Sequence, residues 1–195
     1  MSESSVVAPG PEALEEAAAR LESVRTRIAN AARRAGRDPA TITLVGVAKR
    51  QPLERIVASV EAGLGVLGEN FVQETREMRP RLEAALAARG DGRARPLAWR
   101  MVGRLQRNKL ALAVSLFDAI ESVDRLELVA PLARHAEAAG RILEVLVQVN
   151  LGDEIQKGGC RVEDLPALAR AVAAEPALRL GGLMTVPPAS EDPEA

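Results

Sequence analysis

Residues 42–52 read Ile-Thr-Leu-Val-Gly-Val-Ala-Lys-Arg-Gln-Pro: an apolar run, then Lys49, then a proline that can open a helix. Such a run is typical of a strand buried on both faces, and Pro52 fits the first turn of the helix that follows it. A lysine at the carboxyl end of a buried strand lies where α/β folds place their chemistry, in the mouth formed by the strand-to-helix loops. Because we expect its ammonium to be partly withdrawn from water, Lys49 is a candidate Schiff-base nucleophile.

The rest of the chain repeats the alternation of strand and helix. Helical spacing of apolar residues precedes the Lys49 strand at 14–31, and Pro80 is expected to kink or shorten the helix in which it lies. Further strands are predicted at 66–67, 97–102, 119–120, 143–149 and 180–186, with helices between them. This pattern indicates a parallel sheet covered by helices. Length alone favours an open doubly wound sheet over an eight-stranded barrel, which normally needs about 250 residues.

Composition limits the function classes. Lys+Arg 26 nearly balance Asp+Glu 27, so no bulk field attracts nucleic acid or anionic lipid. One cysteine, Cys160, and one histidine, His135, offer no metal site, and both are interpreted as structural. No apolar run reaches membrane-spanning length and no secretory leader is evident, so a cytoplasmic location is expected.

The expected organisation is a single domain. A chain of 195 residues with 47% hydrophobic residues can bury one sizeable core. We expect this domain to cover residues 12–187, between a disordered N-terminus, 1–11, and a disordered polar tail, 188–195.

One glycine motif imitates a nucleotide site. Residues 63–68 read Gly-Leu-Gly-Val-Leu-Gly and satisfy the glycine spacing of a dinucleotide fingerprint. That fingerprint requires a strand before it and a helix directly after it, whereas here a helix precedes it and a short strand lies inside it. We therefore interpret the motif as a helix stop followed by a tight turn.

Several blocks resemble one known family in order and spacing. The blocks are Val-Gly-Val-Ala-Lys (45–49), Gly-Glu-Asn-Phe-Val-Gln-Glu (68–74), Trp-Arg-Met-Val-Gly-Arg-Leu-Gln-Arg-Asn-Lys (99–109), Val-Asp-Arg-Leu (123–126), Val-Gln-Val-Asn (147–150) and Gly-Leu-Met (182–184). From about Leu14 to Pro187 the chain resembles the pyridoxal phosphate homeostasis proteins. The resemblance implies the barrel of alanine racemase without its second domain, and pyridoxal 5'-phosphate held as an aldimine on Lys49.

The chain also departs from the family pattern. A Ser-x-Gly-Met-Ser segment that cradles the cofactor phosphate and an Arg-Ile-Gly segment beside the ring normally follow, and neither is in this sequence. Arg100 stands where the family usually has histidine, and Arg104 where it usually has proline. The expected fold is therefore α/β, a (β/α)8 TIM-type barrel of the alanine racemase N-terminal type truncated to about six strand-helix units.

The resemblance supplies further site candidates beside Lys49. Asn70 could hydrogen-bond the pyridoxal ring hydroxyl, or simply cap the following helix. Met184 is a cofactor-binding candidate on the last strand. Lys157 is a second candidate for the amine that captures the aldehyde; the plain alternative is that it is a charged residue of a flexible loop. Lys109 lies near a helix N-terminus, where anions are favoured, but we interpret it as a solvated surface charge.

The function implied by the resemblance is pyridoxal 5'-phosphate homeostasis: reversible capture by Lys49 and release to apo-enzymes, by a chain expected to be a monomer. One alternative is a cofactor-dependent amino-acid racemase, or a Schiff-base lyase such as an aldolase. Another is a truncated scaffold without cofactor. A two-base racemase of this barrel type uses a tyrosine opposite the lysine, and the chain has no tyrosine. Carriage of the cofactor is therefore preferred over catalysis.

Overall fold

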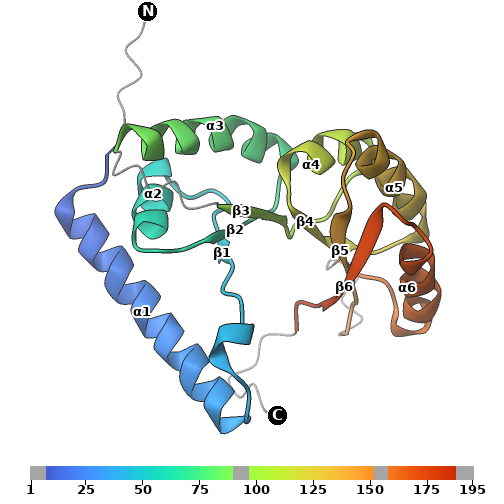
Figure 1. The fold of residues 1–195 in the computed structure, drawn as a ribbon, viewed down its shortest axis with the longest axis horizontal. Coiled ribbons are helices and arrows are strands. Elements are labelled where there is room, and N and C mark those ends of the chain that lie inside the picture. Colours follow the sequence, from blue (N-terminus) through green and yellow to red (C-terminus); the bar gives the residue numbers. More distant parts are fainter. Residues whose placement is uncertain (1–7, 90–96, 152–157, 188–195) are drawn as a thin grey trace, which may run out of the picture. The chain divides into compact units, whose positions relative to one another are not determined.

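Helices and strands alternate along the chain, as the sequence predicts (Figure 1). The structure is a computed structural model that describes residues 8–89, 97–151 and 158–187. The chain divides into two compact units. Unit 1 is Met1–Glu69 with Gln73–Ala98, and unit 2 is Asn70–Val72 with Trp99–Ala195.

Unit 1 consists of a parallel strand pair and its helices. Its elements are α1 (Pro11–Arg34), the 3-10 helix η1 (Pro39–Thr41), β1 (Gly46–Val47), α2 (Leu53–Glu61), β2 (Val66–Glu69) and, from Gln73 on, α3 (Val72–Ala88). β1 and β2 are parallel, with Gly46 opposite Leu67. The side chains of Val57, Leu67 and Leu82, from α2, β2 and α3, are almost completely buried. The helices and strands therefore contribute to one apolar core.

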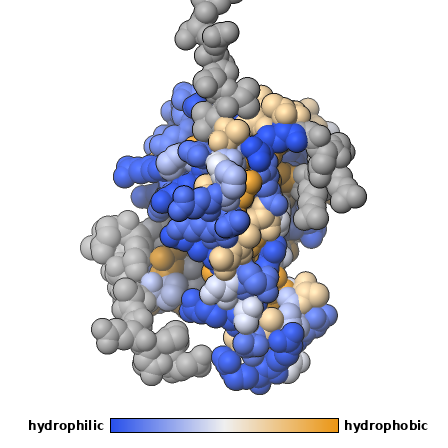
Figure 2. Space-filling model, turned by 90° about the vertical axis from the view of Figure 1, so that its left-hand side faces the viewer, coloured by the Kyte–Doolittle hydropathy of each residue, from blue (hydrophilic) through white to orange (hydrophobic). Residues whose placement is uncertain are grey.

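The residues at the two ends of α1 are of the kinds that stabilise helix termini. Pro11 occupies the first turn together with Glu12, and Arg33 and Arg34 lie in the last turn. Acidic residues at the start and basic residues at the end of a helix oppose its macrodipole. Ala32 is the buried residue of this helix, and most of its other side chains are exposed. The side of the molecule that carries α1 is accordingly mostly hydrophilic, with apolar residues between the charged ones (Figure 2).

Unit 2 is a parallel sheet with its helices. Its elements are β3 (Ala98–Met101, from Trp99 on), η2 (Arg107–Lys109), α4 (Leu110–Leu116), β4 (Ala119–Val123), η3 (Leu126–Leu128), α5 (Val129–Ala138), β5 (Leu143–Gln148), η4 (Val162–Asp164), α6 (Leu165–Ala173) and β6 (Leu178–Met184). The strands lie in chain order, β3-β4-β5-β6, and all pairs are parallel. A doubly wound sheet reverses its strand order. The open-sheet alternative is therefore wrong for this unit, and the order is that of a barrel.

Three local predictions need correction. The strand expected over 42–48 is reduced to β1, because its partner β2 offers a short ladder and pairs only through Leu67 and Gly68. Helix α3 is not shortened by Pro80, which lies inside it; Pro80 is exposed, so water can satisfy the carbonyl that the proline cannot bond. The spacing of Asp124 and Glu127 is typical of a capping box and predicts that Asp124 caps the next helix, but its carboxylate pairs with arginines instead. The single domain over 12–187 stays a prediction.

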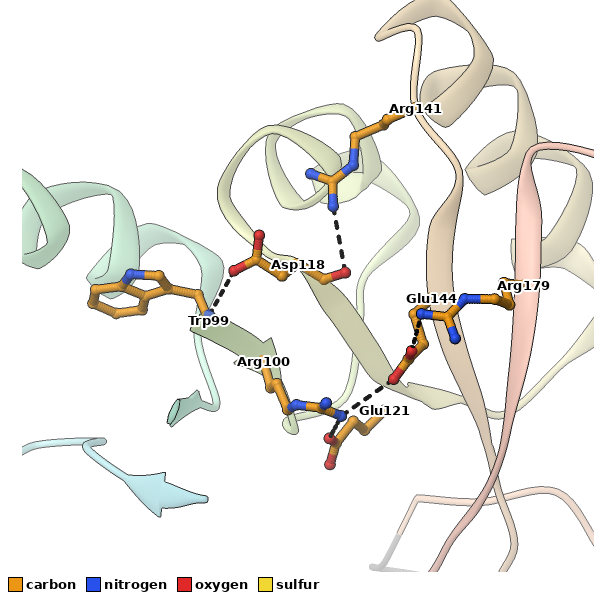
Figure 3. Close-up of polar contacts among 7 residues, drawn as sticks. All are labelled: Trp99, Arg100, Asp118, Glu121, Arg141, Glu144 and Arg179. Atoms are coloured by element: carbon orange, nitrogen blue, oxygen red, sulfur yellow. Dashed lines mark hydrogen bonds and ion pairs between the residues drawn. The ribbon is translucent and has the colours of Figure 1, made fainter. Parts of the chain in front are cut away.

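A row of charged side chains crosses the four strands of unit 2 (Figure 3). From β3, Nη1 of Arg100 lies 2.8 Å from Oε1 of Glu121 on β4 and 3.4 Å from Oε1 of Glu144 on β5. The other oxygen of Glu144 pairs with Nη2 of Arg179 on β6. Gly181 makes room for this row, because a Cβ there would lie 3.1 Å from Cγ of Glu144. Two positive and two negative charges cancel, so this charged row neutralises itself.

Removing the central arginine of the row should destabilise the fold more than removing the terminal one. In Arg100→Met the two carboxylates of Glu121 and Glu144 lose the cation between them, so we expect a loss of about 1–3 kcal/mol in the free energy of unfolding. Arg179 has a side chain that is 66% exposed, against 25% for Arg100, so Arg179→Met should cost less than about 1 kcal/mol. Urea unfolding of both variants measures the difference, and equal losses would contradict this account of the row.

Cys160 is buried and lies beside the carboxyl end of β5. Its backbone N–H donates to the Gln148 carbonyl at 2.8 Å, and its carbonyl accepts from the Asn150 N–H at 2.9 Å. Burial raises the pKa of the Cys160 thiol, a backbone hydrogen bond lowers it, and the carboxylates of Asp164 and Asp124 raise it. Since the thiolate is the nucleophile, a raised pKa keeps Cys160 in its unreactive neutral form. This supports its interpretation as a structural residue.

Native protein should therefore react slowly with iodoacetamide at neutral pH, and urea-unfolded protein at the usual thiol rate. Because the folded chain holds the Cys160 proton more tightly than the unfolded chain, the associated stability is complete below the usual thiol pKa and is lost as the pH rises through the folded value. Cys160→Ala should remove that alkaline dependence. Unfolding curves at neutral and alkaline pH test it, and equally fast alkylation of native and unfolded chains would refute the burial argument.

Candidate functional site

The carboxyl end of β1 carries Lys49, two residues beyond the strand. Ala48 is buried and its N–H donates to the Gly68 carbonyl at 2.9 Å, which extends the contact with β2. A turn follows, in which the Gln51 N–H donates to the Ala48 carbonyl at 3.0 Å. Arg50, the third residue of this turn, has a φ of 55°, in the left-handed region of the backbone that residues other than glycine rarely adopt. Lys49 is thus presented by a tight and strained turn.

The side chain of Lys49 is exposed, so the expectation that its ammonium is partly withdrawn from water is wrong for the described residues. The reason is local: the chain leaves the sheet at Val47, and Lys49 lies in the turn rather than in the strand. Within residues 8–89, 97–151 and 158–187, Lys49 makes no hydrogen bond or ion pair. An aldehyde can reach this amine, which has no ionic partner among the described residues, so access rather than desolvation is what fits Lys49 for a carbonyl cofactor.

A cavity of about 380 Å³ lies in unit 1 beside this turn. Residues of α1, β1, α2 and the turn after β1 line it, among them Gly46, Ala48 and Gln51, but Lys49 does not. Gly46 makes room for the Leu64 side chain in the loop between α2 and β2, because a Cβ there would lie 2.3 Å from Cδ2 of Leu64. The Lys49 turn therefore borders this cavity through Ala48 and Gln51, whereas Lys49 itself does not line it.

Unit 2 holds Asn70, directly after β2 in sequence. The loop after β3 presses against it, because a Cβ at Gly103 would lie 2.2 Å from the Asn70 carbonyl oxygen. The Asn70 side chain is half-buried, and within the described part of the chain the structure records no capping hydrogen bond from it. Asn70 lines a second cavity, of about 410 Å³, with Phe71, Gly103, Arg104, Leu105, Gln106 and Arg125.

The other predicted residues are not brought into that cavity. Met184 ends β6 half-buried and opposite Gln148, and its carbonyl accepts from the Val149 N–H at 2.9 Å. It is not among the residues lining the cavity at Asn70. Lys157 lies outside the described residues. Lys109 ends η2 half-buried and likewise does not line the cavity.

Two lining residues were missed as binding groups by the sequence analysis. Arg104 follows β3 and Arg125 follows β4, so each comes shortly after the carboxyl end of a parallel strand. That placement was the available signal: basic residues after two neighbouring parallel strands end up at the same edge of the sheet. Among the described residues, no group of three or more histidine, cysteine, aspartate or glutamate side chains could hold a metal ion. No described helix is both long and apolar enough to cross a membrane.

Comparison with known families places most of the chain in one of them. Residues 19–195 match the family model described as alanine racemase, N-terminal domain. A protein from Pseudomonas aeruginosa named pyridoxal phosphate homeostasis protein is 40% identical over 86% of this chain and 68% of its own length. A protein of the same name from Escherichia coli K12 is 40% identical over 88% of this chain and 70% of its own length.

Solved structures agree with the sequence relatives. An unknown protein from Bifidobacterium adolescentis has a TM-score of 0.83 at 30% identity, covering 94% of this chain and 74% of its own. PipY from Synechococcus elongatus PCC7942, solved with PLP bound, has a TM-score of 0.72 at 30% identity, covering 89% and 72%. An alanine racemase from Clostridium difficile 630, at 15% identity and a TM-score of 0.59, shares the fold. With parallel strands in chain order and relatives at 40% identity, the chain belongs to the pyridoxal phosphate homeostasis protein family and has an α/β fold of the alanine racemase barrel type.

Proposed function

We propose that this chain binds pyridoxal 5'-phosphate through Lys49 and keeps it available for apo-enzymes, as a monomer in the cytoplasm. Family membership supports the homeostasis role, because the curated relatives carry that name and PipY was solved with PLP bound. The observation that carries the proposal is the Lys49 turn: an exposed amine at the carboxyl end of β1, without an ionic partner among the described residues.

Attachment would use the Lys49 side-chain nitrogen directly. The neutral amine attacks the aldehyde carbon, a bond forms between Nζ and that carbon, and the aldehyde oxygen leaves as water. The reverse reaction with water restores both partners, so no other reagent is needed for release. An exposed lysine permits both directions, because neither the cofactor nor water has to displace a covering side chain of the described chain.

Asn70 and Met184 are proposed as additional cofactor contacts. The Asn70 amide can donate to or accept from a ring hydroxyl, and it borders a cavity of about 410 Å³, which is large enough for a small molecule. Met184 offers an apolar, polarisable side chain at the end of β6. Lys157 is proposed as a second, alternative lysine whose amine can capture the aldehyde.

Binding without catalysis is the favoured role. The cofactor supplies carbanion stabilisation, but the protein must orient the substrate and supply an acid or a base. The whole sequence contains no tyrosine and one histidine, His135, which lies exposed on α5. This chain therefore lacks the tyrosine that a racemase of this type needs opposite the lysine. The structural likeness to alanine racemases is under 25% identity and supports the fold alone.

The cofactor-loaded protein should show an absorbance band in the visible range that Lys49→Ala abolishes. The sequence has three lysines, so Lys109→Ala is the matched control and should keep the band. Lys157→Ala measures the share of the alternative amine and should lower the band little. Reduction with borohydride followed by peptide mass spectrometry should place the adduct on Lys49. Persistence of the full band in Lys49→Ala would transfer the attachment to another amine, with Lys157 examined first.

Free amino acids should not be racemised by the loaded protein. We expect L-alanine incubated with it to yield D-alanine no faster than with pyridoxal 5'-phosphate alone, because the chain lacks the tyrosine base. Chiral chromatography measures both rates, with the Lys49→Ala variant as a protein control. Steady formation of D-alanine by the wild-type chain alone would establish the racemase alternative.

A further inference from the structure

The cavity beside Asn70 contains two arginines that the proposed function does not use. Among the described residues that line it, Arg104 and Arg125 are the charged ones. The other described lining residues are neutral, and one of them, Phe71, is 45% exposed. A cavity of about 410 Å³ with two guanidinium groups and an accessible aromatic ring suits a small compound with a negative charge.

A buried carboxylate fixes both arginines. The side chain of Asp124 is only 4% exposed, and its Oδ1 pairs with Nη1 of Arg125. Its Oδ2 lies 3.4 Å from Nε of Arg104. Nη2 of Arg125 also donates to the Leu105 carbonyl at 2.9 Å. Because a buried carboxylate must be paired, Asp124 keeps the two guanidinium groups together despite their mutual repulsion.

Arg104 retains most of its donors for a ligand. Asp124 contacts only its Nε, and the structure records no partner for Nη1 or Nη2 within the described residues. The side chain is 70% exposed, against 32% for Arg125, whose two Nη atoms are already engaged. A guanidinium edge with two parallel N–H donors matches the two oxygens of a carboxylate or a phosphate group.

The charge of this cluster also favours an anion. Two arginines and one aspartate leave one net positive charge, in contrast to the charged row from Arg100 to Arg179, which balances itself. Within residues 8–89, 97–151 and 158–187, no carboxylate lines the cavity to accept a cation. The cluster therefore has one unbalanced positive charge and guanidinium donors without acceptors. An oxyanion supplies the negative charge and the acceptor oxygens.

We propose that Arg104, oriented by Asp124 and supported by Arg125, forms a binding site for the oxyanion group of a small molecule, either a phosphate or a carboxylate. Lys49 is not part of this site, but Asn70, a proposed cofactor contact, lines the same cavity, so the inference deepens the proposed function and rests on it for that shared cavity. Arg104 is the contacting residue, and Asp124 acts as a positioning residue through it.

Titration with inorganic phosphate and, separately, with acetate tests this site. Two-dimensional NMR of the arginine Nε–H signals should show a saturable shift of the Arg104 signal, and calorimetry should give at least a 10-fold weaker affinity for Arg104→Ala. Arg107→Ala is the matched control, because Arg107 is an exposed arginine of the next helix that does not line the cavity. It should bind as the wild type does.

The two anions and one further variant separate the outcomes. A response to phosphate alone assigns a phosphate group, and a response to acetate alone assigns a carboxylate. Lys49→Ala should keep anion binding, so failure of the cofactor proposal leaves this result unaffected. Equal weakening in Arg104→Ala and Arg107→Ala would reduce the effect to general surface charge, and absence of any saturable shift in the wild type would overturn the site.

Discussion

Parallel strand pairing is the constraint from which the functional features of this chain follow. A parallel partner can be reached only by a return connection, so a helix follows each of β3, β4 and β5, and consecutive strands present their carboxyl ends in the same direction. The first residues after β3 and β4 therefore meet at one edge of unit 2. Arg104 is a neighbour of Asp124 and Arg125 for this reason, although α4 and β4 separate it from them in sequence.

The same pair of chemical groups, guanidinium and carboxylate, has two different uses in unit 2. Along the strands, Arg100 lies between Glu121 and Glu144, and all partners come from the protein. Beyond the strand ends, Asp124 serves two arginines and leaves one of them with exposed donors. The first arrangement fixes the relation of neighbouring strands, whereas the second leaves a charge that a ligand can satisfy.

The sequence predicted the elements better than their edges and contacts. Apolar periodicity was sufficient for the alternation of helix and strand, because burial of whole faces decides it. It failed for β1, where the length of the partner strand sets the ladder, and for Pro80, where exposure lets a helix tolerate a missing donor. Those outcomes depend on neighbours remote in sequence, which no local pattern contains.

The site shows the same division. The order of the motifs identified the family and singled out Lys49, since a strand followed by lysine and a helix is a local signal. The exposure of Lys49 depends on the left-handed Arg50 turn, and the pairing of Asp124 with Arg104 depends on two separate loops. Capping was a reasonable expectation for Asp124 from spacing alone, but a nearby guanidinium is a stronger partner than a backbone amide.

The accessibility of Lys49 has a chemical consequence for the whole surface. Of the 26 basic residues only three are lysines, so nearly all of the positive charge is carried by guanidinium groups. A guanidinium stays protonated at neutral pH and does not condense with aldehydes as an amine does. The chain can therefore remain highly charged while offering very few amines, and reductive amination becomes a route to label a small, countable set of positions that includes Lys49.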